Sequence, residues 1–541
     1  MTFKYETYFP HPKIRDTQSY AIDKILDAYI NKNKSTVILE AGTGVGKSAI
    51  AMTVARYITE KFDNTEEEKY SPGSYFLTTQ KILQKQYTKD FGKPKGRMCS
   101  IQSSSNYKCS YHKRNTCQES QRLLRAEDKE SRFFKACVYN CKYKNAKKDF
   151  IESPESVTNF PYFVTESTYS GKILPRKFLV IDESHNAESE LSKFIEVKIS
   201  ERFCKSTLKL SWPSQTTQFK VVKWIRDTYF PKVKSQLQHF EKMLQKTGLK
   251  ERIAEFTSVS RQYDMLSSHV EKIDTFLSHY NKDNWVMEEI KSEGRSQRKF
   301  SFRAIDISPF AKDYLLRMGK RVLLMSATIL DKDTFCKSLG LRIDDVEFIS
   351  IDTPFSEENR PVYVYPIGSM SAKSISYTLP KMVSAIREIL KSHKSEKGII
   401  HCHTFKIANY IKKNIRSKRL LIHNSENRDS VLNNHMTSSE NTVLLSPSMC
   451  EGVDLKDDLS RFQIIVKVPY PYLGDPLVRK RMNKWEKWYS LQTAKTIVQA
   501  AGRSVRSEKD SATTYILDSD WGRFYNRNSG LFPKTFKKSL K

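Results

Sequence analysis

The sequence lacks the marks of a membrane-spanning or secreted protein. It has no run of about 18 or more apolar residues, the length that indicates a transmembrane helix, and no signal-peptide pattern at its start. It also has no long low-complexity segment. We therefore expect an intracellular protein without a membrane partner, in the cytoplasm or on the nucleoid, or in the nucleus if the source is a eukaryote.

Acidic residues are scarce relative to basic ones. The 541 residues include 61 Asp and Glu against 92 Lys and Arg, which gives a net charge of +31. A phosphate backbone attracts such a surface, and the affinity falls steeply as salt is added. The charge therefore favours a nucleic-acid partner, and the length predicts several domains rather than one.

Cysteine is also uncommon, yet five of the nine cysteines lie between Cys99 and Cys141. Their spacing differs from the paired C-x-x-C knuckles of a zinc ribbon, and an intracellular location disfavours disulfides. Thiolates are soft metal ligands, so the candidates for an iron-sulfur cluster, for zinc or for unligated core thiols are Cys109, Cys117, Cys137 and Cys141. We expect that Cys99 is not a ligand.

A glycine-rich segment follows the apolar, strand-like run of residues 36–39. Its glycines can adopt positive φ angles, which lets successive backbone N–H groups converge on an anion where a helix begins. Lys47 would reach the β and γ phosphates of a nucleotide, and the Ser48 hydroxyl would bind Mg²⁺. The predicted phosphate-binding residues are Ala41, which replaces the usual first glycine, Gly42, Thr43, Gly44, Val45, Gly46, Lys47 and Ser48.

Two adjacent carboxylates end a second apolar run, residues 178–181. Asp182 would hold Mg²⁺, and Glu183 would orient and deprotonate the attacking water, which is the division of labour that phosphoryl transfer requires. An Asp-Glu pair after a strand is otherwise a solvated strand end. Its combination with Lys47 favours a nucleotide hydrolase.

Two arginines complete the predicted site. Arg503 and Arg506 follow a helical stretch that begins near Ser490, and their i, i+3 spacing places them on one face if the helix continues. A guanidinium suits the charge that develops on a transferring phosphoryl group, although each arginine alone could form a surface salt bridge. Gln499 would help to sense the nucleotide or couple it to the nucleic acid. A second domain must bring these residues to Lys47.

These motifs resemble those of superfamily 2 helicases, in particular the XPD/DinG branch. The resemblance is carried by Asp182-Glu183-Ser184-His185 and by the Gln-x-x-Gly-Arg-x-x-Arg pattern of residues 499–506. Further similar segments are residues 8–18, 77–86, 324–330, 352–355 and 452–454. The resemblance implies that Arg15, Gln18 and Asp454 also bind the nucleotide, and that His185 links this site to Ser326 and Thr328.

The resemblance further implies a function and its cofactors. It implies an ATP-dependent DNA helicase that uses Mg²⁺, carries a 4Fe-4S cluster on the four cysteines, and moves 5′ to 3′ on single-stranded DNA. Expected partners are single-stranded and forked DNA, with an RNA-DNA hybrid as a further candidate, bound by a monomer. No nuclease segment stands before Tyr8, so we do not expect an exonuclease-fused form.

Two alternatives of other kinds stay open. The first is an ATP-driven translocase or remodeller that displaces proteins or RNA from DNA without processive unwinding. The second is a binding module with a degenerate motor, which the presence of Lys47, Asp182 and Glu183 disfavours. Tyrosines among basic residues near the cysteines suit either base stacking or packing around a metal site.

The expected fold class is α/β, with two RecA-like motor domains built on parallel sheets with flanking helices. The resemblance implies that an iron-sulfur domain and a helical arch domain are inserted into the first motor domain. Motor domain 1 comprises residues 1–94, 153–189 and 301–340, the iron-sulfur domain residues 95–152, the arch domain residues 190–300, and motor domain 2 residues 341–541. We expect no strand alternation in the arch domain. The strands expected in motor domain 2 are residues 362–365, 398–401, 419–422, 443–446 and 462–468.

Overall fold

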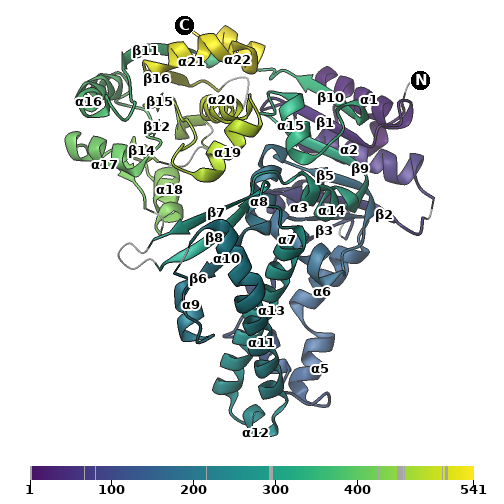
Figure 1. Cartoon of the computed structure of the whole chain (residues 1–541). Helices are drawn as coiled ribbons and strands as arrows, with labels where there is room; N and C mark the ends of the chain where they lie inside the picture. The colour runs from purple at the N-terminus through teal and green to yellow at the C-terminus, as the bar shows by residue number, and fades with distance from the viewer. Residues whose placement is uncertain are drawn as a thin grey trace.

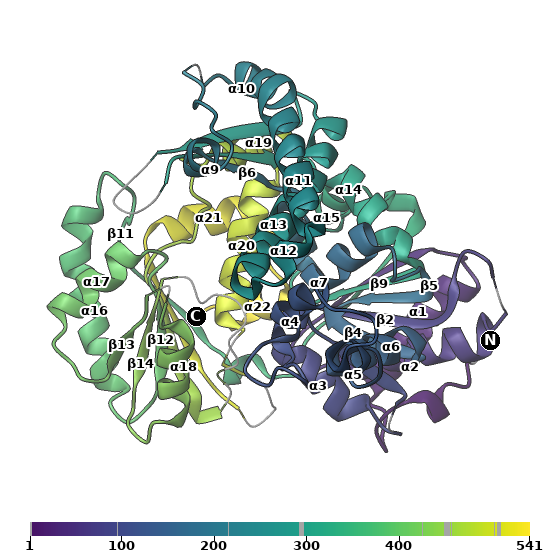
Figure 2. The same cartoon turned by 90° about the horizontal axis from the view of Figure 1, so that it is seen from below.

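The structure is a computed structural model, in which two α/β units lie side by side and a third part projects between them (Figure 1). Figure 2 shows the molecule from below, with this projection along one side of both units. The described residues are 3–65, 67–79, 81–94, 96–214, 216–291, 297–424, 426–447, 455, 457–502, 504–505 and 510–541. Within these ranges, no helix combines the length and apolarity that crossing a membrane requires.

The first unit is built on a seven-stranded sheet with the order β10-β1-β9-β5-β2-β4-β3. Every neighbouring pair is parallel. The strands are β1 (Thr36–Ala41), β2 (Ser71–Thr78), β3 (Met98–Ile101), β4 (Glu155–Asn159), β5 (Arg176–Ile181), β9 (Gly319–Ser326) and β10 (Val346–Ile351). Strands β1 and β5 are both neighbours of β9 and run in the same direction. The loops that follow β1 and β5 therefore lie at the same edge of the sheet.

Helices cover both faces of this sheet, which explains why its strands are apolar on both sides. Along β5, Phe178 and Val180 belong to one apolar cluster, whereas Leu179 and Ile181 belong to the cluster on the opposite face. The flanking helices are α1 (Asp16–Ile30), α2 (Lys47–Tyr57), α3 (Lys81–Phe91), α7 (Phe160–Thr165), α8 (Ala187–Ile195), α14 (Ser308–Tyr314) and α15 (Lys332–Leu339).

The second unit has a six-stranded parallel sheet with the order β11-β16-β15-β12-β14-β13. Its strands are β11 (Val362–Gly368), β12 (Gly398–His401), β13 (Leu420–Ile422), β14 (Val443–Ser446), β15 (Phe462–Ile465) and β16 (Thr513–Asp518). Its helices are α16 (Ile375–Ser392), α17 (Phe405–Asn414), α18 (Arg428–Thr437), α19 (Pro476–Lys484), α20 (Trp488–Ala501), α21 (Asp520–Asn528) and α22 (Lys534–Ser539). Two RecA-like units with parallel sheets are therefore present, as predicted.

Two further parts join the first unit. The cysteine segment, residues 95–152 of the prediction, contains α4 (Cys117–Leu124), α5 (Arg132–Tyr139) and α6 (Lys142–Glu152). The projection, defined here as residues 196–305, contains α9 (Glu201–Ser206), α10 (Gln218–Trp224), α11 (Phe230–Gln245), α12 (Thr247–Lys250) and α13 (Ile253–His279). Helices α11 and α13 pack along each other and form its long axis (Figure 1).

The projection also contains strands, which the sequence analysis did not expect. The strands β6 (Val197–Ser200), β7 (Trp285–Ile290) and β8 (Lys299–Ala304) form an antiparallel sheet with β8 in the centre. Phe300 and Phe302 of β8 are fully buried. β6 is stabilised by a partner about a hundred residues away, so the local sequence gave no sign of the pairing.

Two strands also lie across the predicted domain boundaries. β3 falls within the predicted iron-sulfur domain but pairs with β4 in the first sheet. β10 falls within predicted motor domain 2 but pairs with β1. The boundaries had been drawn from the positions of motifs, whereas the sheet to which a strand belongs depends on its hydrogen-bonding partners.

Candidate nucleotide site and its surroundings

The loop after β1 has the geometry of an anion site at a helix N-terminus. Gly44 and Gly46 have φ angles of +85° and +86°, and α2 begins directly after Gly46. The backbone amides at this end of α2 carry the positive end of the helix dipole. Lys47 starts the helix, and its Nζ donates to the carbonyl oxygen of Ala41 at 3.1 Å. The ammonium group therefore lies against the loop that the sequence predicted.

The predicted residues Arg15 and Gln18 hold this loop from α1. Arg15 donates to the carbonyl oxygens of Gly44 at 2.8 Å and Val45 at 2.9 Å, and Gln18 Nε2 donates to that of Val45 at 3.0 Å. A Cβ atom on Gly46 would lie 2.5 Å from Gln18 Nε2. The positive φ angle of Gly46 also favours glycine there, and the two side chains fix the loop through its backbone.

A third contact to the loop comes from the segment after β10. Thr353 Oγ1 donates to the carbonyl oxygen of Thr43 at 2.9 Å. A Cβ atom on Gly44 would lie 2.0 Å from Cζ of the Phe355 ring, which is buried against the loop. The loop is thus enclosed between α1 and residues 353–355, and both sides restrict its conformation.

Asp182 follows β5 and is buried next to this loop. Its Oδ2 accepts a hydrogen bond from the Tyr87 hydroxyl at 3.0 Å, and its Oδ1 accepts one from the Glu183 amide at 2.9 Å. Burial, and then the charge of Glu183, raise the pKa of Asp182 to about 6, although the Lys47 charge opposes this. The Tyr87 hydroxyl also interacts with Ser48. Ser48 and Asp182 are therefore close to each other through their shared neighbour Tyr87. The positive charge of Lys47 compensates only part of the cost of burying the Asp182 carboxylate.

His185 connects this carboxylate pair to the second unit. Its Nδ1 lies 2.7 Å from Ser326 Oγ and 3.3 Å from a Glu183 carboxylate oxygen. Its Nε2 lies 2.9 Å from Gln499 Nε2, and Gln499 also donates to Thr328 Oγ1 at 3.0 Å. The contacts of Gln499 with His185 and Thr328 therefore join the second unit to the first.

The four candidate cysteines come from neighbouring turns of the cysteine segment. Cys117 and Cys141 Sγ atoms are 3.7 Å apart, at the beginnings of α4 and α6. Burial, and then the charge of Cys141, raise the pKa of Cys117 to about 12, with smaller contributions from Cys109 and Cys137. The four thiols thus lie within electrostatic reach of one another. Across the described residues, however, no three His, Cys, Asp or Glu side chains are close enough to form one metal site.

Cys99 stands apart from these four. It lies on β3, and its thiol donates to the carbonyl oxygen of Gly96 at 3.7 Å.

The tyrosines of the segment divide into two groups. Tyr107 and Tyr143 pack against each other with ring centroids 5.6 Å apart, whereas Tyr139 is exposed. Packing and surface roles are therefore both represented among them.

Comparison with known proteins places this geometry in a family. Residues 11–211 match the family described as "Type III restriction enzyme, res subunit", and residues 386–539 match the "Helicase C-terminal domain". A probable ATP-dependent helicase of Methanocaldococcus jannaschii is 21% identical over 98% of this chain and 95% of its own length. The chain is an XPD/DinG-like helicase of superfamily 2. It is thus an ATP-hydrolysing enzyme that acts on nucleic acid.

Other similar proteins agree with this assignment. An ATP-dependent DNA helicase of Haemophilus influenzae, YoaA, is 21% identical over 38% of this chain and 32% of its own length. A solved structure titled XPD helicase has 15% identity and a TM-score of 0.66, and the alignment covers 96% of this helicase and 99% of that chain. At such low identity the structural likeness establishes the shared fold.

Three predicted site residues of this helicase lie outside the described residues. They are Asp454, Arg503 and Arg506, and their roles stay predictions.

The site also includes Tyr87, which was not predicted from the sequence. Tyr87 of α3 directly follows residues 77–86, one of the segments that resemble the helicase family, but only the fold brings its hydroxyl to Asp182.

Proposed function

We propose that this helicase couples ATP hydrolysis to 5′-to-3′ movement on single-stranded DNA and unwinds forked duplexes. The main support is a chain of contacts from Ser48 of the phosphate loop to Gln499 of the second RecA-like unit, which runs through Tyr87, Asp182, Glu183 and His185. A change at the nucleotide can thereby alter how the two units meet. Repeated opening and closing of such a pair moves a motor along a strand.

The proposed hydrolysis uses ATP with Mg²⁺. Ser48 and Asp182 would hold the cation, which would neutralise charge on the β and γ phosphates. The chemistry of the site fits it, because the pKa of Asp182 is raised by burial and a divalent cation would compensate its charge. Lys47 would leave the carbonyl oxygen of Ala41 to contact the phosphates.

Glu183 is the proposed general base. Its carboxylate would take a proton from water as the water oxygen bonds to the γ-phosphorus and the bond to the ADP oxygen breaks. We propose that Arg503 and Arg506 contact the phosphoryl oxygens at this stage. Gln499 and His185 would then report the loss of the γ-phosphate to the second unit.

We propose further that Cys109, Cys117, Cys137 and Cys141 hold a 4Fe-4S cluster. Four thiols that gather in a short segment suit the soft irons of such a cluster, and this segment would be the iron-sulfur domain. The projection would be the arch domain. Bound iron would cross-link α4, α5 and α6, which have a small core of their own.

The test is unwinding by anaerobically purified protein of three duplexes, with a 5′ tail, a 3′ tail or an RNA strand. We expect ATP-dependent strand separation of the 5′-tailed duplex, with Lys47→Ala as the inactive control. Glu183→Gln should bind ATP without hydrolysing it. Release of a bound protein from DNA without strand separation would instead favour a translocase that remodels complexes, and preference for the 3′ tail would contradict the proposed polarity.

A further inference from the structure

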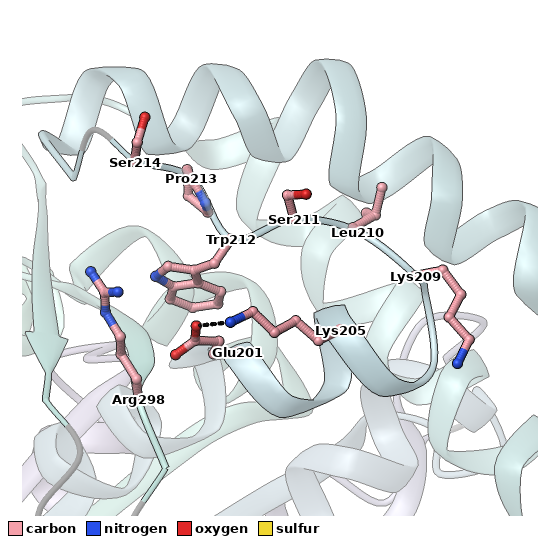
Figure 3. A pocket seen from close by; sticks show the side chains of 9 residues that line it. All are labelled: Glu201, Lys205, Lys209, Leu210, Ser211, Trp212, Pro213, Ser214 and Arg298. Atoms are coloured by element: carbon pink, nitrogen blue, oxygen red, sulfur yellow. Dashed lines mark ion pairs between the residues drawn. The ribbon is translucent and has the colours of Figure 1, made fainter.

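A cavity of about 560 Å³ lies on the projection, apart from the nucleotide site. Its walls are α9, the loop that follows α9, and Arg298 directly before β8 (Figure 3). The Glu201 amide, at the start of α9, donates to the carbonyl oxygen of Arg298 at 2.9 Å and so holds these two segments together. Figures 1 and 2 place α9 on the opposite side of α11 and α13 from the cysteine segment. The cavity therefore belongs neither to the motor cleft nor to the cysteine segment.

Basic side chains dominate the charge of this cavity. Lys205, Lys209 and Arg298 line it, against a single carboxylate, Glu201. Lys205 pairs with Glu201 at 2.7 Å, and both lysines are exposed. Arg298 is oriented by Glu289, whose Oε1 lies 2.5 Å from both its Nε and its Nη2. A guanidinium has five N–H donors, so this single oxygen leaves donors that can reach an anion.

An aromatic wall stands beside these cations. The Trp212 ring stacks on Phe300, with centroids 4.3 Å apart and an interplanar angle of 15°, and the Arg298 guanidinium lies 5.8 Å from the Trp212 centroid. Trp212 Nε1 is buried and has no hydrogen-bond acceptor among the described residues. Figure 3 shows this nitrogen on the side of the ring towards Arg298. A buried N–H without an acceptor is costly, so an incoming oxygen would be favoured there.

We infer that this cavity binds a nucleotide of single-stranded nucleic acid outside the motor cleft. A phosphate would contact Lys205, Lys209 and Arg298, and the nucleoside would pack against Trp212. The volume suits one nucleotide, since small-ligand sites span roughly 300 to 1,000 Å³. Cations beside an aromatic ring are also how proteins bind single strands without regard to sequence. The inference rests on the proposed function, because that function supplies a separated strand beside the projection.

The first test locates the contact directly. The full-length protein is irradiated with an oligonucleotide that carries a photoreactive pyrimidine, and cross-linked peptides are identified by mass spectrometry. We expect cross-links on the peptide that contains Trp212. The absence of these cross-links, under conditions in which other peptides cross-link, would overturn the inference. Protection of the Trp212 peptide by polyglutamate but not by an unlabelled oligonucleotide would also overturn it, because the site would then bind an acidic protein segment.

The second test measures energetics with matched variants. Lys205→Ala/Lys209→Ala removes two cavity cations, whereas Lys232→Ala/Lys242→Ala removes two exposed cations of α11. For a long oligonucleotide, the cavity variant should lose about 3- to 10-fold in affinity at low salt. Its slope of log K against log salt should fall by about 1.4, because each single-strand phosphate contact contributes roughly 0.7. Equal slopes for the two variants would contradict the inference.

Failure of this inference can be distinguished from failure of the proposed function. ATPase activity stimulated by an oligonucleotide that fills only the motor cleft should be the same in the cavity variant and the parent. If the parent does not unwind the 5′-tailed duplex, the proposed function fails, and the cross-link to the Trp212 peptide is still measured on its own.

Discussion

At the scale of single residues, the site shows how burial prepares a carboxylate for a cation. Asp182 sits at the end of a strand that is buried on both faces, and it has hydrogen bonds from Tyr87 and a backbone amide but no direct ion pair among the described residues. Its pKa is raised by burial first and by Glu183 second. The folded protein therefore holds an unfavourable charge at neutral pH, which the proposed Mg²⁺ would compensate.

This leads to a prediction on stability. The pKa of Asp182 is about 6 in the folded chain against 3.8 normally, so the stabilisation present below pH 4 is lost as the pH rises to 6. Asp182→Asn removes this loss and should stabilise the metal-free protein at pH 8 by on the order of 2 kcal/mol, while it abolishes ATPase activity. Thermal unfolding at pH 8 and pH 4.5 measures this. An equal effect at the two pH values would contradict the explanation.

A buried charge cluster illustrates the opposite case. Asp63 contacts Lys177 at 2.9 Å, Lys320 at 2.8 Å and Arg321, and the Lys177 side chain is completely buried. Burial alone would raise the pKa of Asp63, but hydrogen bonds from Lys320, Lys177 and Arg321 outweigh it and lower the pKa to about 2. The stability that Asp63 provides is present above pH 4 and is lost as the pH falls towards 2.

We predict that Asp63→Ala destabilises the first unit by about 3 kcal/mol at pH 7, because it leaves buried cations with too little negative charge. Asp90→Ala, on the exposed face of α3, is the control and should change stability by about 0.5 kcal/mol or less. Denaturant unfolding gives both values. Equal stability of the two variants would show that Glu67, which also pairs with Lys177 at 2.8 Å, suffices.

At the scale of elements, the cysteine segment is the part that would depend most on the proposed cluster. Its three helices have 8, 8 and 11 residues, too short to be stable alone. Cys117, Cys137 and Cys141 lie at or near their ends and are buried. A metal that joins these ends would supply the stability that helix length does not provide.

We predict that Cys137→Ser lowers bound iron and exposes the cysteine segment to proteolysis, whereas Cys99→Ser leaves both unchanged. Iron analysis of anaerobic protein and limited proteolysis test this pair. Some DNA-stimulated ATPase activity should persist in Cys137→Ser, because the two parallel sheets fold around separate cores, while duplex unwinding should be lost. Zinc without iron in the parent protein would refute the cluster.

At the scale of the whole molecule, the projection is covalently part of the first unit but also contacts the second. Arg303 of β8 makes two hydrogen bonds of 2.8 Å to Asp475, at the start of α19. Arg481 of α19 is buried and donates to the carbonyl oxygens of Ile305 at 2.9 Å and Ala304 at 3.2 Å, both in the projection. The projection should therefore move when the two units change their relative position.

We predict that Arg303→Ala lowers the unwinding rate about tenfold with a smaller effect on ATP turnover. The expected loss corresponds to on the order of 1.5 kcal/mol, typical of a hydrogen bond to a charged group. Glu288→Ala is the matched control, since Glu288 also pairs with Arg303 at 2.8 Å but lies on the adjacent strand β7. The number of ATP molecules hydrolysed per strand separated is the measurement. Equal effects of the two changes would indicate only local destabilisation.

The two parallel sheets and the position of the glycine-rich loop at a helix N-terminus could be predicted from local patterns in the sequence. One apolar run is followed by the glycine-rich loop and Lys47, and another by Asp182. Such runs predict parallel strands, and their carboxyl ends place the residues that follow at one edge of the sheet. β12 and β14 occupy the predicted residues 398–401 and 443–446. Four clustered cysteines were equally visible. Such signals are local, so neighbouring residues suffice to reveal them.

Features that depend on partners far away in the sequence could be found only in the folded chain. β10 joined the first sheet because β1 was its hydrogen-bonding neighbour, and β6 formed because β8 paired with it. The same holds for Tyr87 on Asp182 and for Trp212 among three cations. Each of these pairings brings together residues from separate segments, and the energy of such contacts arises only when the chain has folded.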